Sequence, residues 1–143
     1  MGNMALVRSD GKVKNVTDKI MLGYDDIYSI QYFGTNLRPY WNSKGDRTIE
    51  AEMLAAYNEY DKLLARCYAF DKKLMEDASA AGGKEYAELC ALAYRQSIAA
   101  HKLVESPNGD LLWLSKENNS NGCINTVDLT YPSAPLYLIY NPE

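Results

Sequence analysis

The segment that most limits how this chain can fold is 84–105, which predicts a helix that is apolar on nearly every side. Ser106, Pro107 and Gly109 follow it and predict its end. A helix that is apolar all round has to be buried on more than one face. The apolar positions are Tyr86, Ala87, Leu89, Cys90, Ala91, Leu92, Ala93, Tyr94, Ile98, Ala99, Ala100, Leu103 and Val104.

The stretch before it predicts a second, amphipathic helix of about thirty residues, since apolar residues recur in steps of three and four. Asp46 or Thr48 is placed to cap its first turn, and 81–83 (AGG) supplies its end. Packed antiparallel, this helix covers one face of the segment 84–105. We therefore expect that segment to need more neighbours than the chain provides. The stripe consists of Ile49, Met53, Ala56, Tyr60, Leu63, Cys67, Phe70 and Leu74.

Composition excludes several classes of protein. The 143 residues, with 47% hydrophobic and 24% charged, are typical of one globular domain. A net charge of -4 argues against nucleic-acid binding. No apolar run reaches the roughly 20 residues that cross a bilayer, and the first residues lack the apolar core of a signal peptide. Three widely spaced cysteines predict reduced, buried thiols without a disulfide or metal site, and no cofactor motif is found.

The rest of the chain divides into shorter segments. Residues 1–45 predict a polar tail and a junction, with a strand within 19–33 that Gly34 and Pro39 end. Residues 46–143 predict one or more helical hairpins. Within them, 111–114 predicts a strand that pairs with 124–129, and 131–135 (YPSAP) opens a third helix. Because the chain stops soon after this helix opens, we expect a domain truncated at its C-terminus.

The loop 115–128 is the candidate functional segment, because it concentrates carboxylates, amides and hydroxyls ahead of a predicted helix N-terminus. Glu117 and Asp128 are the candidate catalytic acid and base. Turn formation by the amides and helix capping by Asp128 explain the same pattern without any activity. The candidate substrate-binding residues are Asn118, Asn121, Thr126 and Tyr131.

His101 is the single histidine and lies four residues before Glu105. On a helix, this spacing could present two ligands to a metal ion, but no third ligand is signalled. A favourable contact with the C-terminal end of the helix dipole is the preferred interpretation.

Three strings resemble the secreted glutaminase A family of bacteria and fungi. They are 24–34 (YDDIYSIQYFG), 82–96 (GGKEYAELCALAYRQ), and the pair 114–118 (LSKEN) and 126–135 (TVDLTYPSAP). The resemblance implies a mainly α fold, in which β-rich regions precede a six-hairpin (α/α)6 toroid. This chain would then span the junction and the first antiparallel hairpin of an incomplete toroid, which explains the burial that 84–105 requires.

The resemblance also implies a function. The parent protein would be secreted or periplasmic and would hydrolyse L-glutamine to L-glutamate and ammonia, while this segment alone would be inactive. Two alternatives stay open. One is a six-hairpin domain that binds or processes carbohydrate, since the twelve tyrosines suit sugars as well. The other is a helical scaffold that self-associates through its exposed apolar faces.

Overall fold

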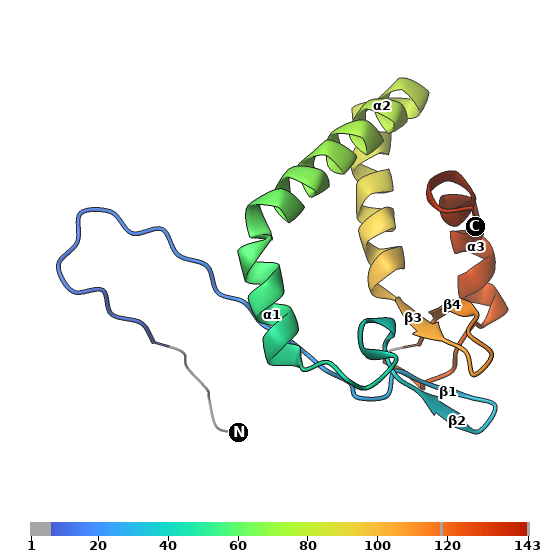
Figure 1. Cartoon of the computed structure of the whole chain (residues 1–143). Helices are drawn as coiled ribbons and strands as arrows, with labels where there is room; N and C mark the ends of the chain where they lie inside the picture. Colours follow the sequence, from blue (N-terminus) through green and yellow to red (C-terminus); the bar gives the residue numbers. More distant parts are fainter. Residues whose placement is uncertain (1–6, 118, 143) are drawn as a thin grey trace.

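The computed structural model describes residues 7–117 and 119–142, and the fold is mainly α-helical (Figure 1). Its helices are α1 (Ile49–Asn58), α2 (Tyr60–Ala99) and α3 (Val127–Tyr140), with a 3-10 turn at Tyr40–Asn42. Two short antiparallel hairpins accompany them. In the described part of the chain, no helix is both long and apolar enough to cross a membrane.

The amphipathic stripe folds into α1 and the first part of α2. The predicted Thr48 cap is confirmed, because its Oγ1 accepts a hydrogen bond from Ala51 N at 3.3 Å. The prediction of one continuous helix is wrong at Glu59. This residue leaves the helical geometry (φ -94°, ψ 3°) and separates α1 from α2.

Gly83 turns α2 back on itself. Its backbone (φ 85°, ψ -179°) is non-helical, and the two arms of α2 run antiparallel on either side of it (Figure 1). The ring centroids of Phe70 and Tyr94, one from each arm, lie 4.9 Å apart. Leu74 on the first arm and Ala87 on the second are buried. The predicted helical hairpin is therefore confirmed.

The second arm ends earlier than predicted. Residues 101–105 form strand β3 (His101–Glu105), which pairs antiparallel with β4 (Leu111–Ser115). The prediction of a helix to Glu105 is wrong, because Val104 is fully buried against Ile30 and Leu37 and reaches them only from a strand.

The predicted partner of 111–114 is wrong as well. Strand β4 pairs instead with the segment that precedes it, β3, across the tight turn 106–110. Ile124 makes only an isolated bridge to Lys116, and 127–129 already belongs to α3. Helix α3 therefore begins four residues before the predicted opening.

The N-terminal hairpin supplies the rest of the core. Strands β1 (Ile30–Tyr32) and β2 (Thr35–Leu37) are joined by Phe33 and Gly34, both at positive φ (45° and 84°), as a tight two-residue hairpin turn requires. The predicted strand within 19–33 is thus confirmed at its end, while β2 was not predicted. Ile30 and Leu37 pack on Val104, with Tyr32, Leu112, Leu114 and Ile124 around them.

Much apolar surface of α2 faces outward. Leu89 is 62% exposed and Leu92 is 52% exposed, so the described residues do not cover the second arm on all sides. This agrees with the expectation that 84–105 needs neighbours beyond this chain. The cysteine prediction is half right: the thiols are unbridged, but Cys67 and Cys123 are exposed and Cys90 is half-buried.

We predict that Gly83→Ala destabilises the helical hairpin by about 1–3 kcal/mol, because this φ/ψ combination is open to glycine almost alone. A Cβ at this position would meet nothing within 4 Å, so the cost is backbone strain and not a clash. Urea denaturation followed by circular dichroism measures the change. Gly122→Ala is the matched control, since its Cβ also meets open space. Equal midpoints for the two variants would contradict this account of the turn.

Candidate functional site

The hairpin β3–β4 has two different faces, because successive residues of a strand point to opposite sides. Val104, Leu112 and Leu114 face the N-terminal hairpin and form the small core with it. His101 and Trp113 belong to the other face, and both line a cavity beside α3. One strand pair therefore joins the core on one side and presents polar aromatic residues on the other.

His101 is held at the end of α2 by hydrogen bonds to one ring nitrogen. Its Nδ1 lies 2.6 Å from the carbonyl oxygen of Ser97 and 3.1 Å from the hydroxyl of Tyr137. The hydroxyls of Ser97 and Tyr137 are 2.7 Å apart. Because a carbonyl oxygen only accepts, Nδ1 is the donor in this contact, and in the neutral form of the ring Nε2 has the lone pair. An imidazole oriented in this way can accept a proton from a water molecule or a hydroxyl group.

Two aromatic rings enclose His101. Trp113 stacks on the imidazole, with 5.2 Å between ring centroids and 16° between planes, and Tyr137 meets it edge-on at 5.1 Å. The indole Nε1 of Trp113 is buried and has no hydrogen-bond partner among the described residues. An unpaired buried donor costs about 1–3 kcal/mol. This N–H is enclosed by protein atoms, so its cost is borne by the fold of the described residues.

Two cavities adjoin this cluster, with volumes of about 330 and 360 Å³. His101 and Ser133 line both of them. Since a water molecule takes about 30 Å³, each has room for about ten waters or a small organic group. The first is also lined by Trp113, Thr130, Ala134, Tyr137, Leu138, Asn141 and Pro142, and the second by Ala93, Ser97, Ala100, Ser115, Leu129, Pro132 and Leu136.

The sequence-predicted residues of the loop after β4 lie elsewhere. The backbone N–H of Glu117 donates to the carbonyl of Cys123 at 2.9 Å, and Asn121 Oδ1 accepts from the backbone N–H of Cys123 at 2.7 Å. These bonds close the loop and agree with the interpretation that its amides form turns. Asn118 lies outside the described residues.

The remaining predicted residues belong to the start of α3. Thr126 precedes its first turn without a side-chain cap bond, Asp128 is exposed in that turn, and Tyr131 is 80% exposed. These three residues do not line the two cavities beside His101, and the same holds for Glu117 and Asn121. The structure thus leaves the predicted residues apart from the His101 cluster, and their roles stay predictions.

Sequence reasoning missed the cluster because it placed His101 on a helix. There, His101 and Glu105 would be neighbours, but in β3 they are the first and last residues of a five-residue strand, so the metal-pair interpretation is wrong. The interpretation of a contact with the helix end is confirmed by the bond to the Ser97 carbonyl. Among the described residues, no group of three or more His, Cys, Asp or Glu could hold a metal ion.

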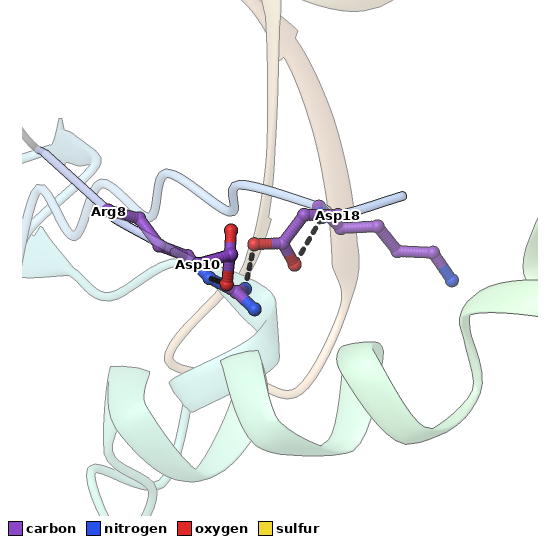
Figure 2. Close-up of polar contacts among 4 residues, drawn as sticks. Arg8, Asp10 and Asp18 are labelled. Atoms are coloured by element: carbon purple, nitrogen blue, oxygen red, sulfur yellow. Dashed lines mark hydrogen bonds and ion pairs between the residues drawn. The ribbon is translucent and has the colours of Figure 1, made fainter. Parts of the chain in front are cut away.

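A second polar cluster lies in the N-terminal segment, far from these cavities in the sequence. Arg8 pairs with Asp10 at 2.8 Å and also with Asp18 (Figure 2). The Arg8 side chain is 63% exposed. Exposed ion pairs of this kind contribute about 0–1 kcal/mol and form no binding site by themselves.

Two family models match the chain. Residues 83–143 match the glutaminase A six helical-hairpin domain, and residues 1–77 match a domain of unknown function, DUF5127. Glutaminase A of Aspergillus oryzae is 31% identical over 145 residues, which cover 97% of this chain and 21% of that protein. A protein of Arthroderma benhamiae named "Probable glutaminase" is 31% identical over 109 residues, covering 76% of this chain and 12% of the relative.

The chain belongs to the glutaminase A family. It spans about a fifth or less of the length of these curated relatives. No solved structure matches it significantly. The two matched regions meet between residues 77 and 83, next to the turn at Gly83. The sequence-based division at residues 45 and 46 stays a prediction.

A polar clamp connects the two matched regions of this glutaminase A family chain. The hydroxyl of Ser29 donates one bifurcated hydrogen bond to the Asp26 carboxylate, with 2.9 Å to each oxygen, and Asp26 pairs with Lys102 Nζ at 3.1 Å. Lys116 Nζ donates to the carbonyl of Ser29 at 2.8 Å. Lys102 and Lys116 belong to the β3–β4 side, so the same strands that present His101 are held by the N-terminal region.

The clamp also controls the ionisation of its carboxylate. Burial acts to raise the pKa of Asp26, but the hydrogen bond from Ser29 and the pairing with Lys102 outweigh it and lower the pKa below its ordinary value. A carboxyl group whose pKa is lowered on folding stabilises the fold above its unfolded-state pKa of about 3.9, and this contribution is lost as the pH falls through the folded-state value.

We predict that Asp26→Asn lowers the free energy of unfolding by about 1–2 kcal/mol at pH 7, because the ion pair and part of the Ser29 bonding are lost. The difference from the unaltered chain should narrow as the pH falls from about 5 to about 2. Urea denaturation across this pH range measures it. Asp71→Asn, at an exposed position of α2, serves as control and should change little. A difference between Asp26→Asn and the unaltered chain that is constant with pH would contradict the clamp.

Proposed function

We propose that this chain is part of an enzyme that hydrolyses L-glutamine to L-glutamate and ammonia, and that the chain is inactive without the rest of that enzyme. The observation that carries the proposal is the 31% identity to Aspergillus oryzae glutaminase A across 97% of the chain. The matched region is about a fifth of that protein, so a complete active site needs residues from outside it. We also propose, from the family resemblance, that the complete protein is secreted or periplasmic.

Hydrolysis of a side-chain amide needs a base that activates water and donors that stabilise the developing oxyanion. In its neutral form His101, which lines both cavities, offers the ring nitrogen Nε2 with a lone pair. Glu117 and Asp128 are the carboxylates that we propose as acid or base in the complete enzyme. Asn118, Asn121, Thr126 and Tyr131 are the residues that we propose to contact glutamine.

A carbohydrate substrate is the second candidate. The specific observation in its favour is the stacked arrangement of His101, Trp113 and Tyr137 beside cavities that carry several hydroxyl groups. Sugars bind to aromatic faces and hydroxyl-rich pockets of this kind. Ammonia release from glutamine, compared with hydrolysis or binding of a glycan panel by the complete enzyme, separates the two candidates.

We predict that Asp128→Asn in the complete enzyme lowers kcat for glutamine about a hundredfold or more, because removal of a positioned acid or base typically costs this much. Ammonia release under saturating glutamine measures the change. Asp71→Asn is the matched control at an exposed helical position and should leave kcat unchanged. Unchanged turnover in Asp128→Asn would remove Asp128 from the mechanism, and Glu117→Gln would then be tested in the same way.

A further inference from the structure

We propose that a cavity between strand β2 and the turn that joins β3 to β4 binds one carboxylate group, and that the guanidinium group of Arg38 is its partner. The cavity has a volume of about 290 Å³ and is separate from the two beside His101. The inference does not depend on the proposed function. It follows from a cation that is left unpaired, is held in place and borders this cavity.

Arg38 is a half-buried cation without an anionic partner in the described part of the chain. Arg8 and Arg47 pair with carboxylates, but the side chain of Arg38 makes no ion pair or hydrogen bond with any described residue. Among the described residues, the fully enclosed side-chain nitrogen that lacks a partner is that of Trp113, so the nitrogens of Arg38 keep contact with solvent. Its five N–H donors therefore remain for an anion that enters the cavity.

The guanidinium group is held from two sides. Its Cζ lies 5.2 Å from the centre of the Tyr28 ring, which is a cation–π distance. It also packs on Gly45, where an added Cβ would come within 3.2 Å of Arg38 Nε. Gly45 has a φ of 72°, so a glycine is favoured there and lets the guanidinium approach the backbone closely. A donor group that is already held in place loses little entropy on binding.

The charge balance of the cavity favours an anion with a single charge. Glu105 is the other charged residue among the described lining residues, and its carboxylate pairs with Lys44 Nζ at 2.7 Å. The hydrogen bond from Lys44 lowers the pKa of Glu105, so these two charges cancel. The positive charge of Arg38 is left over. A carboxylate cancels it, whereas a doubly charged phosphate would bring an excess of negative charge next to Glu105.

The shape and the polarity of the cavity also suit a carboxylate. The planar guanidinium fork matches the two oxygens of a carboxylate in a bidentate pair. Thr35, Asn36 and Ser43 add two hydroxyls and an amide to the lining. Since a water molecule takes about 30 Å³, the cavity has room for about ten waters. It can therefore admit a small carboxylic acid or an acidic side chain.

The cavity spans the two regions that the family models match. Arg38 lies in the region that matches DUF5127, while Glu105 and the turn after it lie in the six-hairpin match. A carboxylate bound to Arg38 therefore stabilises the contact between these regions. Either a free acid or an acidic side chain from the part of the complete protein outside this chain supplies such a group, and measurements on the complete protein distinguish the two.

The test uses the 143-residue chain, with acetate as the probe and acetamide as its uncharged counterpart at constant ionic strength. The five arginines give five side-chain Nε–H signals in an ¹⁵N NMR spectrum, and Arg38→Lys identifies the Arg38 signal by its loss. Arg66 is the internal reference. It is exposed on α2 and, like Arg38, makes no ion pair with a described residue, but it does not line this cavity.

We predict that acetate shifts the Arg38 signal in a saturable way and leaves Arg66 unchanged, while acetamide shifts neither. Arg38→Lys should weaken acetate binding about three- to tenfold, because it keeps the charge but loses the planar fork. Arg38→Gln should abolish binding. In both variants, binding is followed through the backbone N–H signals of Thr35 and Asn36. Arg66→Lys is the matched control and should bind acetate as the unaltered chain does. Circular dichroism establishes that each variant is folded, and if an Arg38 variant is not, the comparison of acetate with acetamide on the unaltered chain decides.

Three outcomes on the 143-residue chain would overturn the proposal: no saturable shift of Arg38 with acetate, an equal shift with acetamide, or tighter binding of phosphate than of acetate.

Thermal unfolding of the complete protein identifies the source of the carboxylate. If the cavity takes a free acid, acetate raises the midpoint and Arg38→Gln removes that rise. If an acidic side chain of the protein already fills it, acetate has no effect and Arg38→Gln alone lowers the midpoint. A midpoint that neither acetate nor Arg38→Gln changes would contradict both forms of the proposal.

Discussion

The contact of Val104 with Ile30 and Leu37 decides where the second arm of α2 ends. Val104 is fully buried, and the N-terminal hairpin reaches it only because 101–105 leaves the helix and becomes a strand. A β-branched residue is well suited to that change, since its side chain packs better on a pleated strand than in a helix. Pro39 extends the same contact through a bridge to Val104.

This one contact also orients the candidate site. Because side chains alternate along a strand, fixing Val104 toward the N-terminal hairpin turns His101 and Trp113 toward α2 and α3. The ion pair between Asp26 and Lys102 holds the face of β3 that carries Val104, two residues before Val104. The region that matches DUF5127 and the region that matches the six-hairpin domain thus pack on each other at the β3–β4 hairpin as well as along the two arms of α2. The geometry of the His101 cluster depends on the contact at the hairpin.

Local patterns predicted the local structure well. The stripe before residue 80, the Thr48 cap and the turn at Gly83 follow from periodicity and backbone preference, which act over a few residues. The strand at 101–105 could not be predicted in this way, because an apolar run such as Leu103–Val104 suits a helix and a strand equally and a distant partner decides. The His101 cluster depends on that strand, so it was missed too. The exposed apolar residues of the second arm, such as Leu92, agree with a family whose helices pack in a larger array.

The most direct test of the account is a set of nuclear Overhauser contacts measured in solution on the complete chain. We predict contacts from the Val104 methyl groups to Ile30 and Leu37, together with contacts between the His101 and Trp113 rings. We also predict a strong sequential Hα–N–H contact at each step of 101–105, as a strand gives. Helical contacts through residue 105, with Val104 packed on the first arm of α2, would contradict both the fold of this hairpin and the site that it presents.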